Sequence, residues 1–101
     1  MNFERITWHR AQQIMDEKGR ESVYLLDCRD EQSYEQSCVP GAVHLSGANV
    51  TEFVATADFD APVLIYCYHG NSSQSAAAYL AEQGFESAYS IDGGFEEYKE
   101  Q

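Results

Sequence analysis

The stretch at residues 64–80, LIYCYHGNSSQSAAAYL, decides how this chain folds. It begins as an apolar, β-prone run that reaches Cys67, and it ends as an alanine-rich segment with helical periodicity. The residues between these two parts are small and polar and surround Gly70, which is typical of a tight turn. The stretch therefore predicts a strand over 62–67, a turn, and a helix over Ser72–Gln83.

The rest of the chain alternates short β-like runs with helical runs, without a linker, a low-complexity tract or an internal repeat. Such alternation is typical of βα units and a parallel sheet. The other expected helices are 8–18, 30–36, 49–55 and a short turn after Gly94, and the other expected strands are 23–28, 42–45 and 87–91. We therefore expect an α/β fold, a doubly wound sandwich with a central parallel sheet of about five short strands and helices on both faces.

Size and composition favour one domain spanning residues 1–101, because two independent cores would each be too small to be stable. The hydrophobic content of 44% argues against disorder despite a net charge of −11. The longest apolar run, 61–68, is much shorter than the roughly 20 residues of a membrane span, and the N-terminus has no apolar signal core. We expect a cytoplasmic protein without a membrane partner.

The charges and cysteines exclude several classes of ligand. A net charge of −11 disfavours nucleic acid, and no lysine or arginine occurs between Arg29 and Lys99. Any anion held between these positions must therefore rely on backbone N–H groups and histidine. Cys28, Cys38 and Cys67 cannot all pair, and their spacing is not typical of zinc ligands. We expect no disulfide framework, no metal and no cofactor.

Cys67 is expected at the carboxyl end of the central strand, where open parallel sheets bind ligands. The following helix would direct its unpaired N–H groups and the positive end of its dipole toward the loop. A nucleophilic cysteine benefits from this setting, since helix N-termini can lower a thiol pKa from about 8.5 to roughly 3.5–7.5. We predict that Cys67 is the catalytic nucleophile, although a buried structural cysteine beside a helix cap is the simpler alternative. The expected anion-binding loop consists of Tyr68, His69, Gly70, Asn71, Ser72 and Ser73.

Four other residues have both a structural and a functional interpretation. Asp27 and Arg29 could bind substrate or act as structural ions that tie the strand end to neighbouring loops. Cys28 is expected to pack as a small hydrophobe, with a redox role as the alternative. Cys38 lies in a polar loop and could act as a resolving thiol for Cys67.

Three stretches give the chain a resemblance to a known family. The loop CYHGNSS matches the form C-x-x-G-x-S at Cys67, Gly70 and Ser72. The segments LLDCRDEQSYEQSCVPGAVHL (25–45) and GFESAYSIDGGFEEY (84–98) resemble the upstream and downstream signatures of the same family. The chain thus resembles single-domain rhodaneses over nearly its whole length, in particular thiosulfate sulfurtransferases of the GlpE type.

The resemblance implies a double displacement. A thiolate at Cys67 would take the outer sulfur of thiosulfate, release sulfite and hold the sulfur as a persulfide. The acceptor would be cyanide, a small thiol or a dithiol such as thioredoxin. Many relatives have an arginine in the loop where this chain has Ser72, and its absence bears on the affinity for a dianionic donor.

Three other functions fit the same fold. A phosphatase would need a C-x5-R loop, but the sixth residue after Cys67 is Ser73 and no arginine follows in the chain. A non-catalytic binding module would need no nucleophile. A sulfur carrier loaded by a protein persulfide would use the same residues, and the acidic surface would suit a basic partner.

Overall fold

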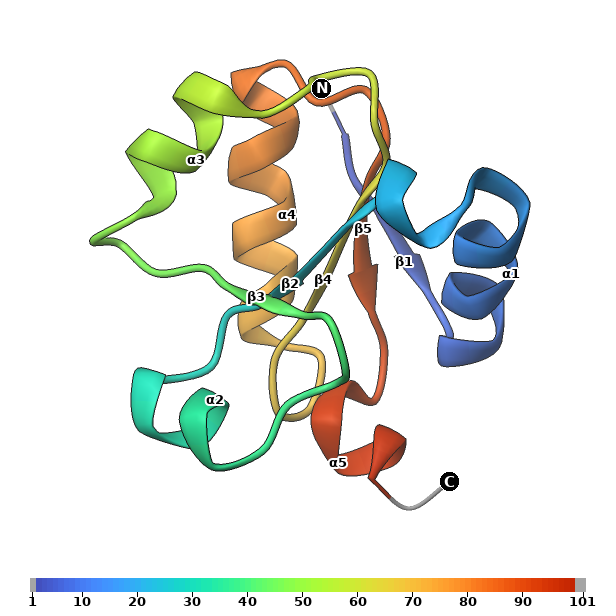
Figure 1. Cartoon of the computed structure of the whole chain (residues 1–101), viewed down its shortest axis with the longest axis vertical. Coiled ribbons are helices and arrows are strands. Elements are labelled where there is room, and N and C mark those ends of the chain that lie inside the picture. Colours follow the sequence, from blue (N-terminus) through green and yellow to red (C-terminus); the bar gives the residue numbers. More distant parts are fainter. Residues whose placement is uncertain (1, 100–101) are drawn as a thin grey trace.

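Within residues 2–99, the part of the chain that the computed structural model describes, five parallel strands form one sheet in the order β1-β5-β4-β2-β3 (Figure 1). The strands are β1 (Glu4–Ile6), β2 (Tyr24–Asp27), β3 (Val43–His44), β4 (Val63–Tyr66) and β5 (Ala88–Ile91). The helices are α1 (Trp8–Lys18), α2 (Glu31–Gln36), α3 (Val50–Thr56), α4 (Ser72–Gln83) and α5 (Gly94–Tyr98), with a short 3-10 turn at Arg20–Ser22. The predicted α/β fold with a central parallel sheet is confirmed.

The central strand β4 has hydrophobic partners on both faces of the sheet. Leu64 and Tyr66 pack with side chains of α1 and α5, whereas Val63 and Ile65 pack with side chains of α4 and, at its edge, α3. All four side chains of β4 are fully buried, which is typical of a parallel strand between two helical layers. Figure 1 shows α3 and α4 on one side of the sheet and α1 on the other.

The strongest local patterns give the most accurate predictions. The helix α4 spans the predicted residues, and α1 begins after Thr7, whose Oγ1 accepts a hydrogen bond from the Arg10 amide at 3.1 Å. Gly19 ends α1 with a φ of +91°, a backbone angle that favours glycine. The observed strands are one or two residues shorter than the predicted runs, although end residues such as Cys28 and Leu45 still donate hydrogen bonds to the neighbouring strand.

The edge strand β1 has no counterpart in the predicted set. Only Ile6 of its three residues is buried, so the sequence ERI shows no strand-like alternation. Backbone pairing defines this strand instead: Ile6 pairs with Ile91 of β5, and the Ile6 carbonyl accepts a hydrogen bond from the Asp92 amide at 2.7 Å.

The carboxyl ends of all strands meet at one edge of the sheet, since every pairing is parallel. The helices α2 and α5 and the loop before α4 gather at this edge, in the lower part of Figure 1. The residues that follow β2 and β4 are therefore brought together there.

Candidate active site

Cys67 directly follows β4, and its sulfur lies inside the turn that leads to α4. The amide of Gly70 donates to Cys67 Sγ at 3.1 Å, and the amide of Ser73 donates to it at 3.4 Å. Gly70 has a φ of +97°, and a Cβ atom at this position would lie 3.1 Å from the amide nitrogen of Gly93. The turn therefore needs glycine at this position to bring its N–H groups to the sulfur.

Two buried hydroxyl groups support the sulfur from the interior. Ser73 Oγ lies 3.4 Å from Cys67 Sγ and 2.8 Å from Ser90 Oγ of β5, and both serines are fully buried. When Cys67 is ionised it has no proton to donate, so the Ser73 hydroxyl donates to the sulfur and accepts from Ser90. Ser90 is absent from the predicted site, although a polar residue at an inward position of an apolar strand is a signal that could have found it.

Cys28 lies opposite Cys67 at the end of the neighbouring strand. Asp27 of β2 pairs with Tyr66 of β4, and the Cys28 amide donates to the Tyr66 carbonyl at 3.0 Å, which continues the parallel register by one residue. Cys28 packs against the hydrophobic cluster beneath α4, as predicted, and it is half-buried and also lines the same cavity as Cys67. The sequence gives no sign of this proximity, because it depends on strand register.

This environment lowers the pKa of Cys67 to about 4. The largest contribution is a hydrogen bond from the Cys28 thiol; burial opposes it, and the Ser73 hydroxyl and the amides of Ser73 and Gly70 lower the pKa further. The hydrogen bond with Cys67 and burial raise the pKa of Cys28, so Cys28 keeps its proton. Cys67 is therefore a thiolate at neutral pH. The amides of Gly70 and Ser73 and the side chains of Cys28 and Ser73 together stabilise it.

A cavity of about 280 Å³ gives access to this sulfur. It is lined by Cys28, Arg29, Asp30, Cys67, Tyr68, His69, Asn71 and Ser72. As a residue Cys67 is only 5% exposed, so the cavity is its route to small reactants. Tyr68 and His69 are exposed at the rim, and the Tyr68 hydroxyl donates to Ser33 Oγ of α2 at 3.1 Å. Six predicted loop residues thus surround Cys67, two of them through backbone amides that bind its sulfur.

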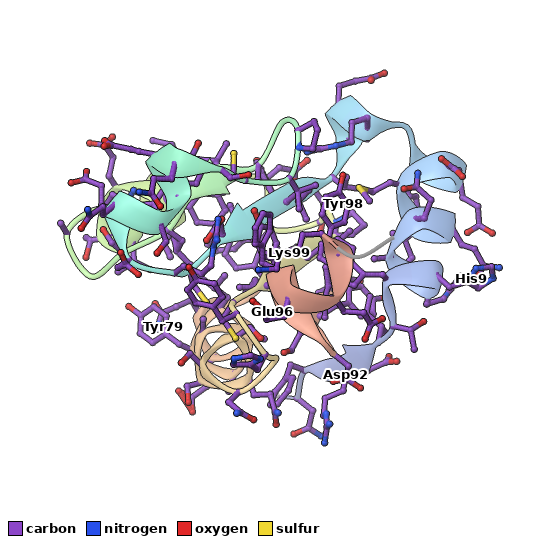
Figure 2. The ribbon with its side chains drawn as sticks, turned by 90° about the horizontal axis from the view of Figure 1, so that it is seen from below. His9, Tyr79, Asp92, Glu96, Tyr98 and Lys99 are labelled. Atoms are coloured by element: carbon purple, nitrogen blue, oxygen red, sulfur yellow. The ribbon has the colours of Figure 1, made fainter. Side chains whose placement is uncertain are left out.

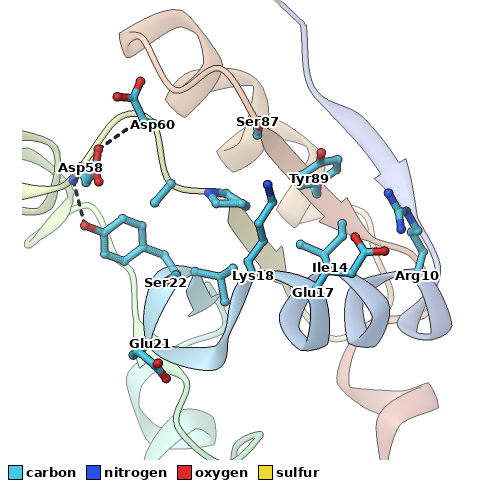
Figure 3. Close-up of a pocket in the computed structure, with 14 residues that line it drawn as sticks. Arg10, Ile14, Glu17, Lys18, Glu21, Ser22, Asp58, Asp60, Ser87 and Tyr89 are labelled. Carbon is cyan, nitrogen blue, oxygen red and sulfur yellow. Dashed lines mark hydrogen bonds between the residues drawn. The ribbon is translucent and has the colours of Figure 1, made fainter.

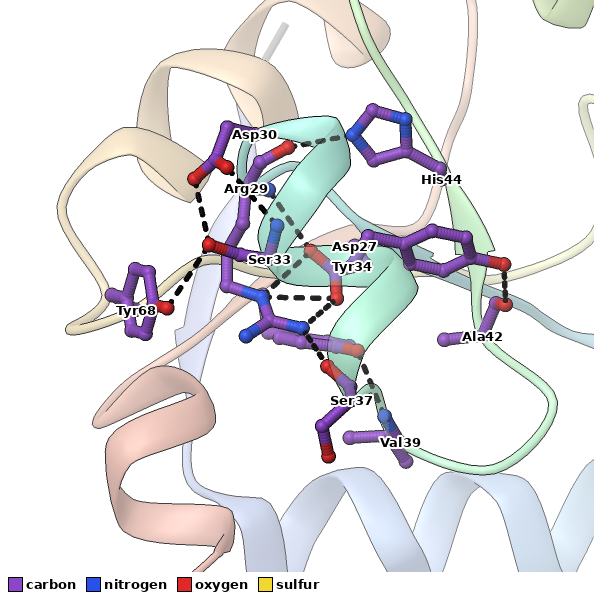
Figure 4. Close-up of polar contacts among 11 residues, drawn as sticks. Asp27, Arg29, Asp30, Ser33, Tyr34, Ser37, Val39, Ala42, His44 and Tyr68 are labelled. Atoms are coloured by element: carbon purple, nitrogen blue, oxygen red, sulfur yellow. Dashed lines mark hydrogen bonds and ion pairs between the residues drawn. The ribbon is translucent and has the colours of Figure 1, made fainter.

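Asp27 and Arg29 form a buried ion pair beside the site (Figure 4). Arg29 Nη2 lies 2.7 Å from Asp27 Oδ2 and also donates to the Ser37 carbonyl, while the guanidinium carbon lies 4.1 Å from the ring centroid of Phe95. His44 forms a hydrogen bond with the Arg29 carbonyl at 2.6 Å. These contacts favour the structural interpretation of the pair, since the charge of Arg29 is already balanced by Asp27.

Helix α5 holds the loop from outside. The amide of Phe95 donates to the Cys67 carbonyl at 2.7 Å, and the amide of Glu96 donates to the Tyr68 carbonyl at 3.0 Å. A Cβ atom at Gly94 would lie 2.4 Å from each of these carbonyl oxygens. Seen from below, α5 crosses this end of the molecule with Glu96 and Lys99 on its outer side (Figure 2). The loop carbonyls are thus bound to α5, and the N–H groups face the sulfur.

The other cysteine and the larger cavity within residues 2–99 differ chemically from the site at Cys67. Cys38 is half-buried, and it is not among the described residues that line the cavity at Cys67. A larger cavity of about 560 Å³ lies at the opposite end of the sheet (Figure 3), where Lys18, Glu21 and Asp58 contribute charges of both signs, and its described lining includes no cysteine or histidine. Residues 2–99 contain neither a group of three or more side chains arranged for a metal ion nor a helix suited to cross a membrane.

Comparisons with known proteins agree with this geometry. The family described as "Rhodanese-like domain" matches residues 7–101. The thiosulfate sulfurtransferase GlpE of Pseudomonas savastanoi pv. phaseolicola is 47% identical over 94 residues, covering 93% of this chain and 85% of that protein. GlpE of Pseudoalteromonas translucida is 46% identical over 95 residues, covering 94% and 88%. In fold, the chain is similar to a rhodanese-like domain protein from Staphylococcus aureus, with a TM-score of 0.78 and 19% identity over 93% of this chain and 89% of that one.

Proposed function

The chain belongs to the family of rhodanese-like domains and is a sulfurtransferase, and from this premise we propose that it moves the outer sulfur of thiosulfate to an acceptor through a persulfide on Cys67. The resemblance predicted from the sequence is confirmed by the family match and by curated relatives of 46–48% identity over more than nine tenths of the chain. These relatives are named as enzymes, which argues against the alternative of a non-catalytic binding module.

In the first step, the Cys67 thiolate attacks the outer sulfur of thiosulfate. A bond forms between Cys67 Sγ and that sulfur, the bond between the two thiosulfate sulfurs breaks, and sulfite leaves with the electron pair. No proton has to move, because a pKa of about 4 keeps Cys67 ionised at neutral pH. Among the described residues that line the cavity, Arg29 is already neutralised by Asp27, so the amide groups aimed at the sulfur stabilise the negative charge.

In the second step, an acceptor attacks the terminal sulfur of the persulfide and Cys67 leaves as a thiolate. A thiol of low pKa is a good leaving group, so the contacts that activate the nucleophile also assist its release. The cavity of about 280 Å³ fits a small acceptor such as cyanide or a small thiol, and a dithiol such as thioredoxin would have to present its sulfur at the exposed rim.

The observation that carries this proposal is the pair of amide donors at 3.1 and 3.4 Å from Cys67 Sγ. The test is a single-turnover reaction of the reduced chain with thiosulfate, without an acceptor, in which released sulfite is measured. We expect one sulfite per wild-type chain and none for Cys67→Ser. Wild-type protein that releases no sulfite, or Cys67→Ser protein that still does, would contradict the proposal.

A sulfur carrier loaded by a protein persulfide is the second candidate. The net charge of −11 opposes a dianionic donor but favours a basic partner protein. Comparing the rate of sulfur uptake from thiosulfate with the rate from a cysteine desulfurase persulfide distinguishes the two. Sulfur uptake that is faster from the desulfurase than from thiosulfate, and that loses this advantage at high salt, supports the function of a sulfur carrier.

A further inference from the structure

Two thiols stand side by side at the carboxyl ends of β2 and β4. Cys28 and Cys67 are register partners, as the hydrogen bond from the Cys28 amide to the Tyr66 carbonyl shows. Neighbouring strands lie about 4.8 Å apart, and register partners direct their side chains to the same face. This separation lies within the roughly 4.4–6.8 Å between Cα atoms that a disulfide spans.

We propose that Cys28 is a resolving thiol that attacks the Cys67 persulfide, releases the outer sulfur as hydrosulfide and leaves a Cys28–Cys67 disulfide. This inference rests on the proposed function, since it needs the persulfide. It adds an activity to the enzyme: the sulfur taken from thiosulfate is reduced to sulfide within the chain instead of being handed to an external acceptor.

The step balances without a further reactant. A bond forms between Cys28 Sγ and Cys67 Sγ, and the bond between Cys67 Sγ and the terminal sulfur breaks, with its electron pair going to the terminal sulfur. The Cys28 proton passes to that sulfur, which leaves as hydrosulfide. In this step the Cys28 sulfur is oxidised from the thiol to the disulfide level, the terminal sulfur is reduced to sulfide, and the Cys67 sulfur stays at the level that it reached in the persulfide.

The position of the proton favours this order of events. Cys28 is protonated while Cys67 is a thiolate, so Cys28 does not compete for thiosulfate. Once Cys67 carries the extra sulfur, the negative charge lies on the terminal sulfur of the persulfide. The Cys28 proton can then neutralise this sulfur as it leaves. The Cys28 thiol thus stabilises the Cys67 thiolate before the sulfur transfer, and it protonates the departing sulfur afterwards.

An external dithiol has a route to the resulting disulfide. Cys28 lines a second cavity of about 370 Å³, bounded by Leu45, Val50 and Tyr79, between the segment after β3 and α4. Tyr79 is exposed at its edge (Figure 2). A dithiol that enters here would reduce the disulfide by thiol–disulfide exchange and return both cysteines to their starting state.

The experiment follows sulfur and thiols in one turnover. The reduced full chain, freed of reductant, receives thiosulfate without an acceptor, and sulfite, sulfide and intact mass are measured. For wild type we expect one sulfite, one sulfide and a loss of two hydrogens, with the disulfide mapped by peptide mass to Cys28 and Cys67. Cys38→Ser, the matched control, should behave as wild type.

Cys28→Ser retains a hydrogen bond donor but cannot form the disulfide. Because Cys28 also stabilises the Cys67 thiolate, the yields at completion are compared and not the rates: we expect one sulfite, no sulfide, and a persistent gain of the mass of one sulfur atom. Sulfite without sulfide from wild type, with the extra sulfur retained, overturns this inference and leaves the proposed function intact. No sulfite from wild type overturns both, and a mapped disulfide that contains Cys38 overturns the assignment of Cys28.

Discussion

Replacing Cys28 by alanine should raise the pKa of Cys67. The Cys28 thiol supplies the largest contribution to the low pKa of about 4, ahead of the Ser73 and Gly70 groups. Alanine removes this donor and leaves the two amides and the Ser73 hydroxyl in place. The thiolate then loses stabilisation relative to the protonated thiol, so its pKa rises.

The size of the shift follows from the nature of the donor. Hydrogen bonds to charged groups contribute about 1.5–3 kcal/mol, and a thiol is a weak donor, so the lower end applies. This corresponds to roughly one pKa unit, since one unit equals about 1.4 kcal/mol. At pH 5 the ionised fraction of Cys67 would fall from about nine tenths to about one half.

The assay is the rate at which iodoacetamide alkylates Cys67 between about pH 3.5 and 7, a range that includes both expected midpoints, with the modified peptide identified by mass. All proteins carry Cys38→Ser, so that fewer thiols react. Cys28→Ser is the matched control, because its hydroxyl still donates, and its midpoint should stay near that of the parent. An unchanged or lower midpoint for Cys28→Ala would refute the assignment of Cys28 as the main donor.

Three further predictions test the surroundings of the site. Asp27→Ala leaves the buried Arg29 without its counter-ion and should lower the free energy of unfolding in urea by about 3–5 kcal/mol. Arg5→Ala, at an exposed ion pair, should lower it by less than about 1 kcal/mol, and equal losses would contradict the structural role of the buried pair. Gly94→Ala, at a φ of +56°, should cost about 1–3 kcal/mol and slow alkylation of Cys67, because its Cβ atom would displace the loop carbonyls; unchanged alkylation would contradict this. Finally, kcat/KM for thiosulfate should rise with ionic strength, because salt screens the repulsion between the dianion and a chain of net charge −11; a fall would indicate a local cationic site.

The fold was predictable where local chemistry is strong. The apolar run into Cys67 and the small-residue helix after it identify β4 and α4, and the Thr7 cap identifies α1. The strand β1 could not be predicted, because backbone pairing with β5 defines it and its side chains show no pattern.

The site was predictable only as far as it is continuous in sequence. Gly70 and the small residues after it indicate a loop that directs amides toward Cys67. The contributions of Cys28 and Ser90 come from other strands, and they depend on sheet register and on which way a side chain points. Alternation along β5 could have indicated that Ser90 points inward, but the sheet register that brings Cys28 and Ser90 to Cys67 cannot be read from the local sequence.

The two amides by which α5 binds the loop carbonyls tie the chemistry of the sulfur to the docking of the last helix. Whenever α5 detaches, the carbonyl oxygens of Cys67 and Tyr68 lose the Phe95 and Glu96 amides and become free to rotate. An oxygen that turned inward would repel the thiolate that the loop is built to hold. The rate of hydrogen exchange at these two amides and the rate at which Cys67 loses its reactivity should therefore both report the detachment of α5.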